Sequence, residues 1–319
     1  MRRRILVTRR LPASAVTLLE EHAELDMHVG ETALSADELC SRLADKDALV
    51  VLLSDRVDAR VIDAATRLKI IANVAVGYDN VDVEYAQSKG IVVTNTPDVL
   101  TAATADLTWA LILAVTRRIG EGERIVRRHA WRGWSFEFML GSSLAGKQLG
   151  IVGAGRIGRA VGARAGAFGM SVAYYTRSPI AWEGAQAMSL DRLLATSDVI
   201  SLHVPLTDTT RHLIDQKALA RMKRTAYFVN TTRGAVVDEA ALAWALRERL
   251  IAGAALDVFE REPEVHPDLL GLENAVLTPH LGSATRETRL AMAELAARNV
   301  MEVLHGRPPL TPVLLQKST

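Results

Sequence analysis

The stretch GIVGAGRIG, residues 150–158, decides the fold. It carries Gly153, Gly155 and Gly158 in the spacing G-x-G-x-x-G, follows the apolar run QLGIV and opens an amphipathic segment, 156–168. In this strand–turn–helix context, glycines permit a tight turn and a close approach of the backbone, so the helix N-terminus can face a pyrophosphate. An isolated glycine motif is weak evidence for dinucleotide binding, because glycine-rich turns are common. With its flanking strand and helix, the motif favours a dinucleotide-binding sheet.

The second strand of such a sheet normally ends in Asp or Glu about 20 residues after the first glycine, where the carboxylate holds the ribose hydroxyls of NAD. Residues 172–178 read VAYYTRS and contain no carboxylate. Arg177 offers a planar fork of donors suited to phosphate oxygens, and Thr176 and Ser178 add hydroxyl donors. We therefore expect NADP, with NADPH preferred over NADH. The alternative is a solvent-exposed arginine in an NAD enzyme that lacks its acid.

Short apolar runs alternate with helical patterns along almost the whole chain, which favours parallel α/β units. Four strands are expected before residue 98, in RRILVT, DALVVLLS, LKIIANVAVG and GIVVTN, and six after residue 147, in QLGIVG, SVAYYT, SDVISLHV, TAYFVNTT, IAGAALDV and NAVLTP. Residues 98–128 read as two helices, and 286–304 as the last helix. Because that helix follows a finished sheet, it should pack on the first domain. The pattern predicts residues 1–98 with 286–319 as one domain and 99–285 as a domain inserted into it.

Composition excludes several functional classes. The 319 residues are 49% hydrophobic and 24% charged, with a formal net charge of +1, so no global field favours nucleic acid or a membrane surface. The single cysteine, Cys40, fits a reducing compartment and rules out a Cys-rich metal site. The most apolar segment, 101–116, is too short for a membrane span and contains Asp106. We expect a cytoplasmic protein with no metal.

Three residues after the glycine loop could carry chemistry. Arg233 follows the strand in YFVNTTRG, Glu262 follows the strand in AALDVF, and His280 ends the strand in LTPH. Reduction of a 2-oxo acid needs a cation for the carboxylate, a proton donor for the carbonyl oxygen and a partner that keeps the donor protonated. A neighbouring carboxylate favours the charged form of an imidazole, whose ordinary pKa is about 6.5. Taken singly, each residue could instead be a loop, turn or capping residue.

The strings around these residues decide between the two interpretations. GAGRIG, NTTRGAVVD, GAALDVFEREP and LTPHLGSAT occur in this order, with VAVGYDNVD and VTNTPDVLTAATAD upstream. Over essentially its whole length the chain resembles the D-2-hydroxy-acid dehydrogenase family, and within it the glyoxylate/hydroxypyruvate reductases. The resemblance implies a Rossmann dinucleotide-binding domain inserted into a flavodoxin-like substrate domain. It also implies NADPH-dependent reduction of glyoxylate to glycolate and of hydroxypyruvate to D-glycerate.

The resemblance further implies roles for single residues. Arg233 would bind the substrate carboxylate, and His280 would be the general acid, polarised by Glu262. Substrate would also contact Leu53 and the backbone amides of Val76 and Gly77. Residues expected around the cofactor are Gly153, Gly155, Arg156, Ile157, Gly158, Thr176, Arg177, Ser178, Thr104, His203, Pro205, Thr231, Thr232, Asp257 and Gly282.

Two rival functions stay open on the sequence. A 3-phosphoglycerate dehydrogenase would share the scaffold, but many of those enzymes carry a C-terminal regulatory extension and NAD-type acids at the second strand. A non-catalytic nucleotide-sensing protein could keep the glycine loop without needing Arg233, Glu262 and His280, and all three are present.

The helix expected at 101–116 also bears on assembly. Its sequence, TAATADLTWALILAVT, is apolar on nearly every face, whereas a surface helix of a monomer shows one apolar stripe. We expect a homodimer that covers it; the alternative is burial within one chain. In the related reductases the region around Trp131 and Trp134 lies near the partner subunit's active site, but here the stretch 130–141 is shorter.

Overall fold

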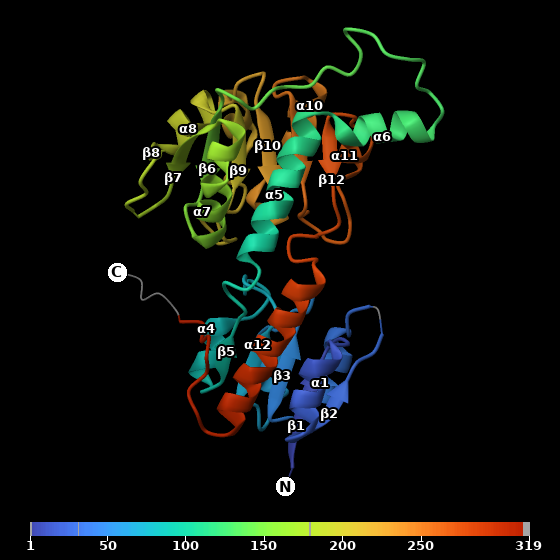
Figure 1. Cartoon of the computed structure of the whole chain (residues 1–319). Helices are drawn as coiled ribbons and strands as arrows, with labels where there is room; N and C mark the ends of the chain where they lie inside the picture. The colour runs from blue at the N-terminus through green and yellow to red at the C-terminus, as the bar shows by residue number, and fades with distance from the viewer. Residues whose placement is uncertain (1, 31, 179, 315–319) are drawn as a thin grey trace. The chain divides into compact units, whose positions relative to one another are not determined.

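The computed structural model describes residues 2–30, 32–178 and 180–314 and divides the chain into two compact units (Figure 1). Unit 1 comprises residues 1–100 and 285–319, and unit 2 comprises residues 101–284. Each unit is built on its own parallel sheet, so the predicted class of two parallel-sheet α/β domains is confirmed. The last five residues of the predicted range 286–319 lie outside the described residues.

Unit 1 has a five-stranded parallel sheet in the order β2-β1-β3-β4-β5, which is the doubly wound order of flavodoxin-like folds. Its central strands β3 and β4 are buried on both faces, which explains their continuous apolar sequence. The strands are β1 Arg3–Val7, β2 Ala23–Met27, β3 Ala48–Val51, β4 Ile70–Asn73 and β5 Val92–Thr94, and the helices before residue 100 are α1 Ala13–Glu20, α2 Ala36–Leu43, α3 Ala59–Asp63 and α4 Val83–Ser88.

The last long helix, α12 (Arg286–Leu304), completes unit 1. Thr285 caps it by accepting a hydrogen bond from the backbone N–H of Thr288, which satisfies one of the unpaired donors of the first turn. Its buried side chains, among them Ala293, Ala297 and Val300, pack against α1, β3 and β4. Helix α12 therefore packs against the sheet of unit 1.

Unit 2 has a seven-stranded parallel sheet in the order β12-β11-β10-β9-β6-β7-β8. The chain starts at β6 in the middle, builds outward to β8 and then crosses back to β9. This is the arrangement of dinucleotide-binding sheets, with the switch of direction between β6 and β9. The strands are β6 Gln148–Val152, β7 Ser171–Tyr175, β8 Ala185–Ala187, β9 Val199–Leu202, β10 Tyr227–Asn230, β11 Gly253–Leu256 and β12 Ala275–Leu277.

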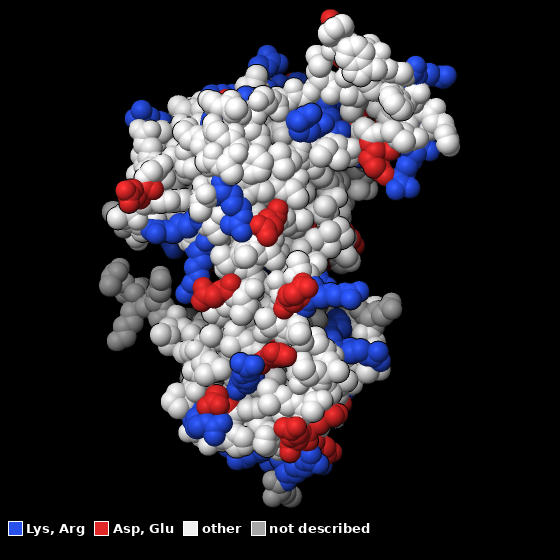
Figure 2. All heavy atoms as spheres, in the orientation of Figure 1, with Lys and Arg blue, Asp and Glu red and all other residues white. Residues whose placement is uncertain are grey.

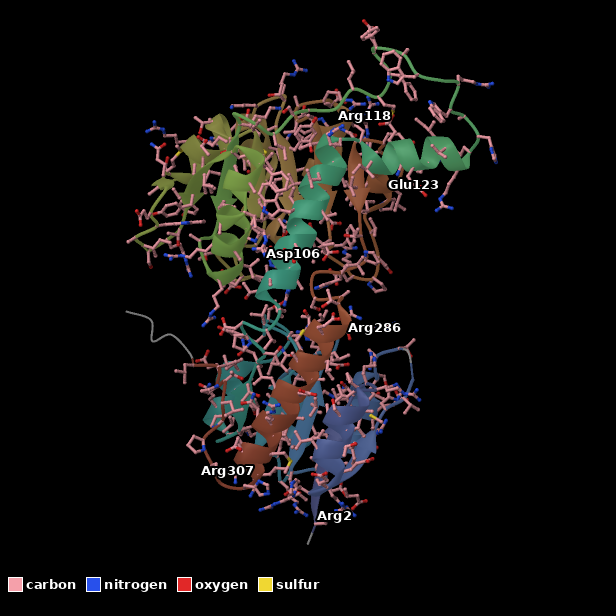
Figure 3. All side chains as sticks on the ribbon, viewed as in Figure 1. Arg2, Asp106, Arg118, Glu123, Arg286 and Arg307 are labelled. Atoms are coloured by element: carbon pink, nitrogen blue, oxygen red, sulfur yellow. The ribbon has the colours of Figure 1, made fainter. Side chains whose placement is uncertain are left out.

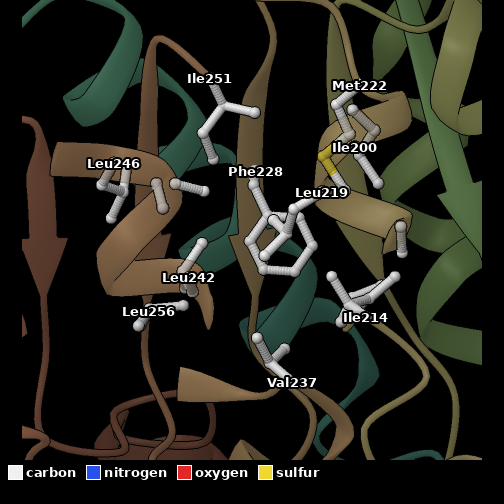
Figure 4. Close-up of a cluster of buried hydrophobic side chains, with 14 of the residues drawn as sticks. Ile200, Ile214, Leu219, Met222, Phe228, Val237, Leu242, Leu246, Ile251 and Leu256 are labelled. Atoms are coloured by element: carbon white, nitrogen blue, oxygen red, sulfur yellow. The ribbon is translucent and has the colours of Figure 1, made fainter. Parts of the chain in front are cut away.

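Helices cover both faces of this sheet. One face packs against α5 (Thr101–Thr116) and α7 (Arg156–Ala163), with Trp109 stacked on Phe168 at 4.2 Å between ring centroids. The other face packs around Phe228, which is fully buried among Leu219, Leu242 and neighbouring aliphatic side chains (Figure 4). The remaining elements of unit 2 are α6 Ile119–Arg127, η1 Ala165–Phe168, α8 Leu190–Thr196, α9 Gln216–Arg221, η2 Gly234–Val236, α10 Glu239–Arg247 and α11 Pro267–Leu270.

Two strands were not predicted from the sequence, and both lie at sheet edges. β2 contains two acidic residues, Glu24 and Asp26, and β8 consists of three residues, two of them exposed. An edge strand is half solvated, so its sequence lacks the apolar run that marks a central strand. The remaining strands all lie within the segments that the sequence predicts.

The charged residues of both signs are interspersed over the face shown in Figure 2. This distribution matches the near-zero net charge and includes no single broad field of one sign on that face. Among the described residues, no helix is both long and apolar enough to span a membrane, and no group of His, Cys, Asp and Glu is arranged to hold a metal ion.

Candidate active site

The glycine loop after β6 has the geometry that its sequence predicts. Gly153 has φ +100°, a conformation that favours glycine, and a Cβ there would lie 2.5 Å from the carbonyl oxygen of His203. A Cβ on Gly158 would lie 2.1 Å from the carbonyl oxygen of Gly153, so α7 can pack this closely only without a side chain. A Cβ on Gly155 would meet no atom within 4 Å, which leaves the backbone open to a ligand.

The start of α7 adds an anion-binding feature to this open loop. Gly155 is the N-cap residue and supplies no side chain to cap the helix. The first N–H groups of the helix, on Arg156 and Ile157, therefore lie beside the open space at Gly155 and carry the positive end of the helix dipole.

His203 follows β9 on the opposite side of the switch point. Its Nε2 lies 2.9 Å from the hydroxyl of Ser201, and its Nδ1 is buried without a hydrogen-bond partner in the described part of the chain. Burial lowers the pKa of His203 to about 3, so the ring is neutral at physiological pH. An orphaned buried nitrogen beside an open glycine loop is a partner for a polar group of a ligand. These residues fit a dinucleotide bound across β6 and β9.

The segment after β7 holds the residues expected at the adenosine ribose. Thr176 is half-buried, and Arg177 and Ser178 are exposed. Within the described residues the Arg177 guanidinium forms no hydrogen bond and no ion pair. It is therefore available to an external anion. Pro179, which follows, lies outside the described residues.

His280 and Glu262 form a direct pair. The His280 Nδ1 lies 2.8 Å from Glu262 Oε2. Because an ionised carboxylate can only accept, Nδ1 must carry the hydrogen and donate it, which leaves Nε2 as the ring nitrogen available to a reactant. The second carboxylate oxygen, Oε1, accepts the backbone N–H of Phe259 at 3.0 Å. Both side chains are only about a quarter exposed, at 24% and 29% respectively.

Arg233 lies in the neighbouring loop, between β10 and η2. Asn230, buried at the end of β10, holds this loop: its amide donates to the Arg233 carbonyl at 2.9 Å, and its oxygen accepts the Thr232 N–H at 3.0 Å. The Arg233 guanidinium donates to the Thr232 carbonyl at 2.8 Å, and its charge acts on Glu262. Arg233, Glu262 and His280 thus come together at the carboxyl edge of one sheet, where ligands of doubly wound folds bind.

Comparison with known proteins places the chain in a family. Residues 109–282 match the model of the D-isomer specific 2-hydroxyacid dehydrogenase NAD-binding domain. A glyoxylate reductase of Thermococcus onnurineus is 49% identical over 321 residues, with 98% of this chain and 96% of the relative covered. The chain belongs to the D-isomer specific 2-hydroxyacid dehydrogenase family.

Solved structures of related proteins agree in fold. An NADPH-dependent glyoxylate/hydroxypyruvate reductase from Sinorhizobium meliloti, solved with NADP and malonate, is 36% identical and has a TM-score of 0.90, with both chains fully covered. A glyoxylate reductase from Paecilomyes thermophila is 34% identical with a TM-score of 0.87, and 98% of each chain is covered. The 2-hydroxyacid dehydrogenase described here is thus an oxidoreductase that uses a nicotinamide dinucleotide.

The carboxylate of Glu262 in this dehydrogenase is held ionised. Burial is the largest single influence and would raise its pKa, but the hydrogen bond and charge of His280, the N–H of Phe259 and the charge of Arg233 together outweigh it. The net result is a pKa of Glu262 below the ordinary value. The carboxylate is therefore negative throughout the physiological range, and it accepts the Nδ1 hydrogen of the imidazole beside it.

Replacing Glu262 with glutamine tests this coupling. Glutamine keeps the shape but loses the charge, so the protonated imidazole loses its anionic partner. Reduction consumes that proton, and we expect the pH above which kcat for reduction falls to move to lower pH. The measurement is the pH–rate profile of both proteins in the reduction direction. An unchanged profile would contradict the pairing.

The other residues expected at the cofactor fall into two groups in this dehydrogenase. Asp257 is buried and holds the His280 loop: its carboxylate accepts the N–H of Leu281 at 2.7 Å, the N–H of Gly282 at 2.8 Å and the hydroxyl of Thr278 at 2.6 Å. Burial raises the pKa of Asp257, although these donors oppose the rise. The loop they fix includes His280 at φ +54°, an unusual value for a residue with a side chain.

The second group connects α5 to the strand ends. The Thr104 hydroxyl donates to the Gly282 carbonyl at 3.1 Å, and the hydroxyls of Thr108 and Thr231 lie 3.1 Å apart. Pro205 is exposed, and its carbonyl accepts the Thr210 hydroxyl at 2.6 Å. The structure brings Thr104, Thr231, Asp257 and Gly282 to one edge of the unit 2 sheet, where the catalytic candidates lie.

The substrate candidates of unit 1 lie on loops that follow β3 and β4. Leu53 is exposed, and among the described residues of unit 1 the N–H groups of Val76 and Gly77 donate no hydrogen bond. Two asparagines fix these loops. Asn73 donates to the Gly77 carbonyl at 2.8 Å, and Asn80 donates to the Leu52 carbonyl at 3.1 Å.

Sequence reasoning missed the residues that shape the site without touching its ligands. Asn73, Asn80, Asn230 and Thr278 each use a side chain to hold a loop at a strand end. For Asn73, Asn230 and Thr278 the available signal was a polar residue at the end of a strand, a position that often takes an aliphatic side chain; Asn80, within a loop, gave no such signal.

Proposed function

We propose that this dehydrogenase reduces small 2-oxo acids with NADPH, converting glyoxylate to glycolate and hydroxypyruvate to D-glycerate. The observation that carries the proposal is the contact between His280 and Glu262, with Nδ1 and Oε2 2.8 Å apart. The pair lies at the same carboxyl edge of the unit 2 sheet as Arg233. A proton donor, its anionic partner and a cation are the groups that reduction of a 2-oxo acid requires. The related enzymes named glyoxylate reductase, and the relative solved with malonate, a small dicarboxylate, support this substrate class.

In the proposed reaction, NADPH supplies the hydride. Arg233 binds the substrate carboxylate and orients the carbonyl, because a guanidinium can hold a carboxylate through two parallel hydrogen bonds. The amides of Val76 and Gly77 hold the other carboxylate oxygen, and Leu53 contacts the remainder of the substrate. His280 donates its Nε2 proton to the carbonyl oxygen, and Glu262 stabilises the charged ring before that transfer.

Residues of unit 2 would bind the cofactor. The N–H groups at Gly155–Gly158 would hold the pyrophosphate, since the loop is open at Gly155 and no side chain caps the helix. Arg177, with Thr176 and Ser178, would bind the 2′-phosphate, and the exposure of Arg177 supports this role. His203, Thr104, Thr231, Asp257 and Gly282 would line the rest of the cofactor site.

An assay of several 2-oxo acids, each with NADPH and NADH separately, tests the proposal. We expect glyoxylate and hydroxypyruvate to give the highest kcat/KM. Activity confined to 3-phosphohydroxypyruvate would point to a 3-phosphoglycerate dehydrogenase instead. Dinucleotide binding without turnover of any 2-oxo acid would point to a nucleotide-sensing protein.

We also infer that the protein forms a homodimer. Unit 2 buries one side of α5, including Trp109 and Ile112, and leaves Ala102, Asp106 and Ala110 exposed, so most of the helix is already covered. The next segment, residues 117–141, exposes more large apolar side chains than α5 does. Seven of the fifteen large hydrophobic side chains exposed in the described part of the chain lie within it: Ile119, Val126, Trp131, Trp134, Phe136, Phe138 and Leu140.

The form of this segment supports the same inference. Helix α6 buries none of its residues, and the chain after it extends away from the sheet of unit 2 (Figure 1). Figure 3 marks Arg118 and Glu123 on this segment; they form ion pairs with Glu121 and Arg127, respectively. An exposed apolar surface of this extent on one segment indicates a protein partner. We infer that the partner is a second copy of this chain, because the resemblance to the family implies a dimer.

Sedimentation equilibrium at micromolar concentration is expected to give twice the chain mass of 34.7 kDa. Replacing both Trp134 and Phe136 with aspartate should shift the protein toward monomer, because two charges would then enter an apolar interface. The charge-neutral control is Trp134→Phe with Phe136→Leu. A wild-type protein that sediments as an active monomer would refute the dimer.

A further inference from the structure

Two glutamates beside the candidate site exchange hydrogen bonds between their side chains and backbones. The backbone N–H of Glu239, the first residue of α10, donates to Glu260 Oε1 at 3.2 Å. The backbone N–H of Glu260, in the loop after β11, donates to Glu239 Oε1 at 2.7 Å. Glu239 is only 5% exposed. The two carboxylates therefore connect the start of a helix to a loop through a reciprocal pair of charge-assisted bonds.

His212 adds a third segment to this arrangement. Its Nε2 lies 3.1 Å from Glu260 Oε1, and its backbone N–H donates to the carbonyl of Ala235 at 2.9 Å. We call Glu239, Glu260 and His212 the carboxylate clamp. Its three members lie outside the catalytic set and outside the residues expected at the cofactor.

Each end of the clamp is close in sequence to a catalytic candidate. Arg233 precedes Glu239 by six residues, with η2 between them, and Glu262 follows Glu260 by two. Phe259, the residue before Glu260, donates its N–H to Glu262 Oε1 at 3.0 Å. The loop that the clamp fixes is therefore the loop that orients the Glu262 carboxylate toward His280.

The two loops are also in direct backbone contact. A Cβ on Gly234, the residue after Arg233, would lie 1.8 Å from the carbonyl carbon of Phe259 and 2.2 Å from the nitrogen of Glu260. No side chain fits at that distance, so the backbones can pack only through glycine. The clamp and this contact together leave the Arg233 loop and the Glu262 loop little freedom to shift against each other.

The influences on the pKa of Glu239 suggest a variant that separates its charge from its role as a hydrogen-bond acceptor. Burial raises the pKa of Glu239, the N–H of Glu260 opposes the rise, and the negative charge of Glu260 adds to it. His266 also faces Glu239, through both its charge and its backbone N–H. What the clamp needs from position 239 is a hydrogen-bond acceptor, which a neutral glutamine amide also provides.

We propose that Glu239 and Glu260 are positioning residues for the reduction: by clamping the Glu262 loop to the start of α10, they set the geometry of Glu262 against His280 and Arg233. This inference rests on the proposed function. It adds that the reactivity of the catalytic pair depends on two acids that touch neither substrate nor cofactor.

The experiment compares Glu239→Ala, which removes the acceptor, with Glu239→Gln, which keeps it. Asp198→Ala is the matched control, because Asp198 also joins two segments through a backbone N–H, that of Gln148 at 2.9 Å, but at the amino edge of the same sheet. Crystal structures of the variants give the distance from His280 Nδ1 to Glu262 Oε2. The pH–rate profile, kcat, KM and the melting temperature are measured for each.

We expect Glu239→Ala to lower kcat/KM for the 2-oxo acid by about 10- to 100-fold, as small misplacements of catalytic groups do. The pH above which reduction falls should move downward, as in Glu262→Gln, and the His280–Glu262 distance should exceed 2.8 Å. Glu239→Gln and Asp198→Ala should keep the wild-type profile, even where Asp198→Ala lowers the melting temperature. Glu260→Ala, at a more exposed position, gives the same test if Glu239→Ala does not fold.

Three results would overturn the clamp. Wild-type kinetics and distance in the two alanine variants would show that it positions nothing. An equal loss in Asp198→Ala would show a general effect of lower stability. The same pH shift in Glu239→Gln as in Glu239→Ala would assign the effect to charge. If the wild type turns over no 2-oxo acid, the proposed function fails, and the distance in the variant crystals still decides the clamp.

Discussion

Replacing His280 with alanine is expected to lower kcat for 2-oxo acid reduction by about 10²–10⁴-fold, the usual worth of a general acid. The Nδ1 of His280 is occupied by Glu262 at 2.8 Å, so Nε2 is the nitrogen that can deliver a proton, and alanine supplies none. Dinucleotide binding should stay close to wild type, because the glycine loop and the segment after β7 do not include His280. Stopped-flow turnover and fluorescence titration with NADPH measure the two quantities.

His305→Ala is the matched control for this variant. His305 is exposed in unit 1, next to the end of α12, and no catalytic role is assigned to it. It should keep wild-type kcat and dinucleotide affinity. A His280→Ala enzyme that retained more than about a tenth of the wild-type kcat would be inconsistent with general acid catalysis by this residue.

Replacing Arg177 with aspartate is expected to reverse the cofactor preference. The wild type should have a kcat/KM for NADPH at least about tenfold above that for NADH, which corresponds to roughly 1.4 kcal/mol of transition-state stabilisation. The arginine is exposed, and the segment 172–178 has no carboxylate that would repel a phosphate. Aspartate would repel the 2′-phosphate and accept hydrogen bonds from the ribose hydroxyls of NADH.

The control for the change of charge is Arg249→Asp, at an exposed position just before β11 and hence at the amino edge of the unit 2 sheet. It alters net charge equally and should leave the ratio of the two kcat/KM values unchanged. A wild type that prefers NADH would refute our interpretation of the segment 172–178.

Central strands and the main helices were predictable because their signals are local. The run LKIIANV gives a strand because β4 is buried on both faces, and the helix α12 spans the same residues, 286–304, that its periodicity predicts. The edge strands β2 and β8 lack that signal, since one side of each is solvated.

The candidate site, too, could be predicted only in part from the sequence. Motifs place Arg233, Glu262 and His280 at strand ends, and parallel strands bring those ends to one edge. The resemblance to the family implied that Glu262 polarises His280. The sequence could not give the geometry of that bond or the left-handed backbone of His280, because both depend on how Asp257 holds the loop 278–282. The clamp of Glu239 and Glu260 joins residues 21 positions apart and has no sequence pattern.

The return of α12 to unit 1 has a consequence for biosynthesis. A ribosome makes the chain from its N-terminus, so every residue of unit 2 is made before α12. Until α12 is made, the surfaces of β3, β4 and α1 that it covers are open to water or to other nascent chains. Unit 2 can fold as soon as residue 284 is clear of the ribosome, since domains generally fold as units. The half that is begun first is thus completed last, and a chain arrested before residue 285 would carry one finished sheet and one uncovered sheet.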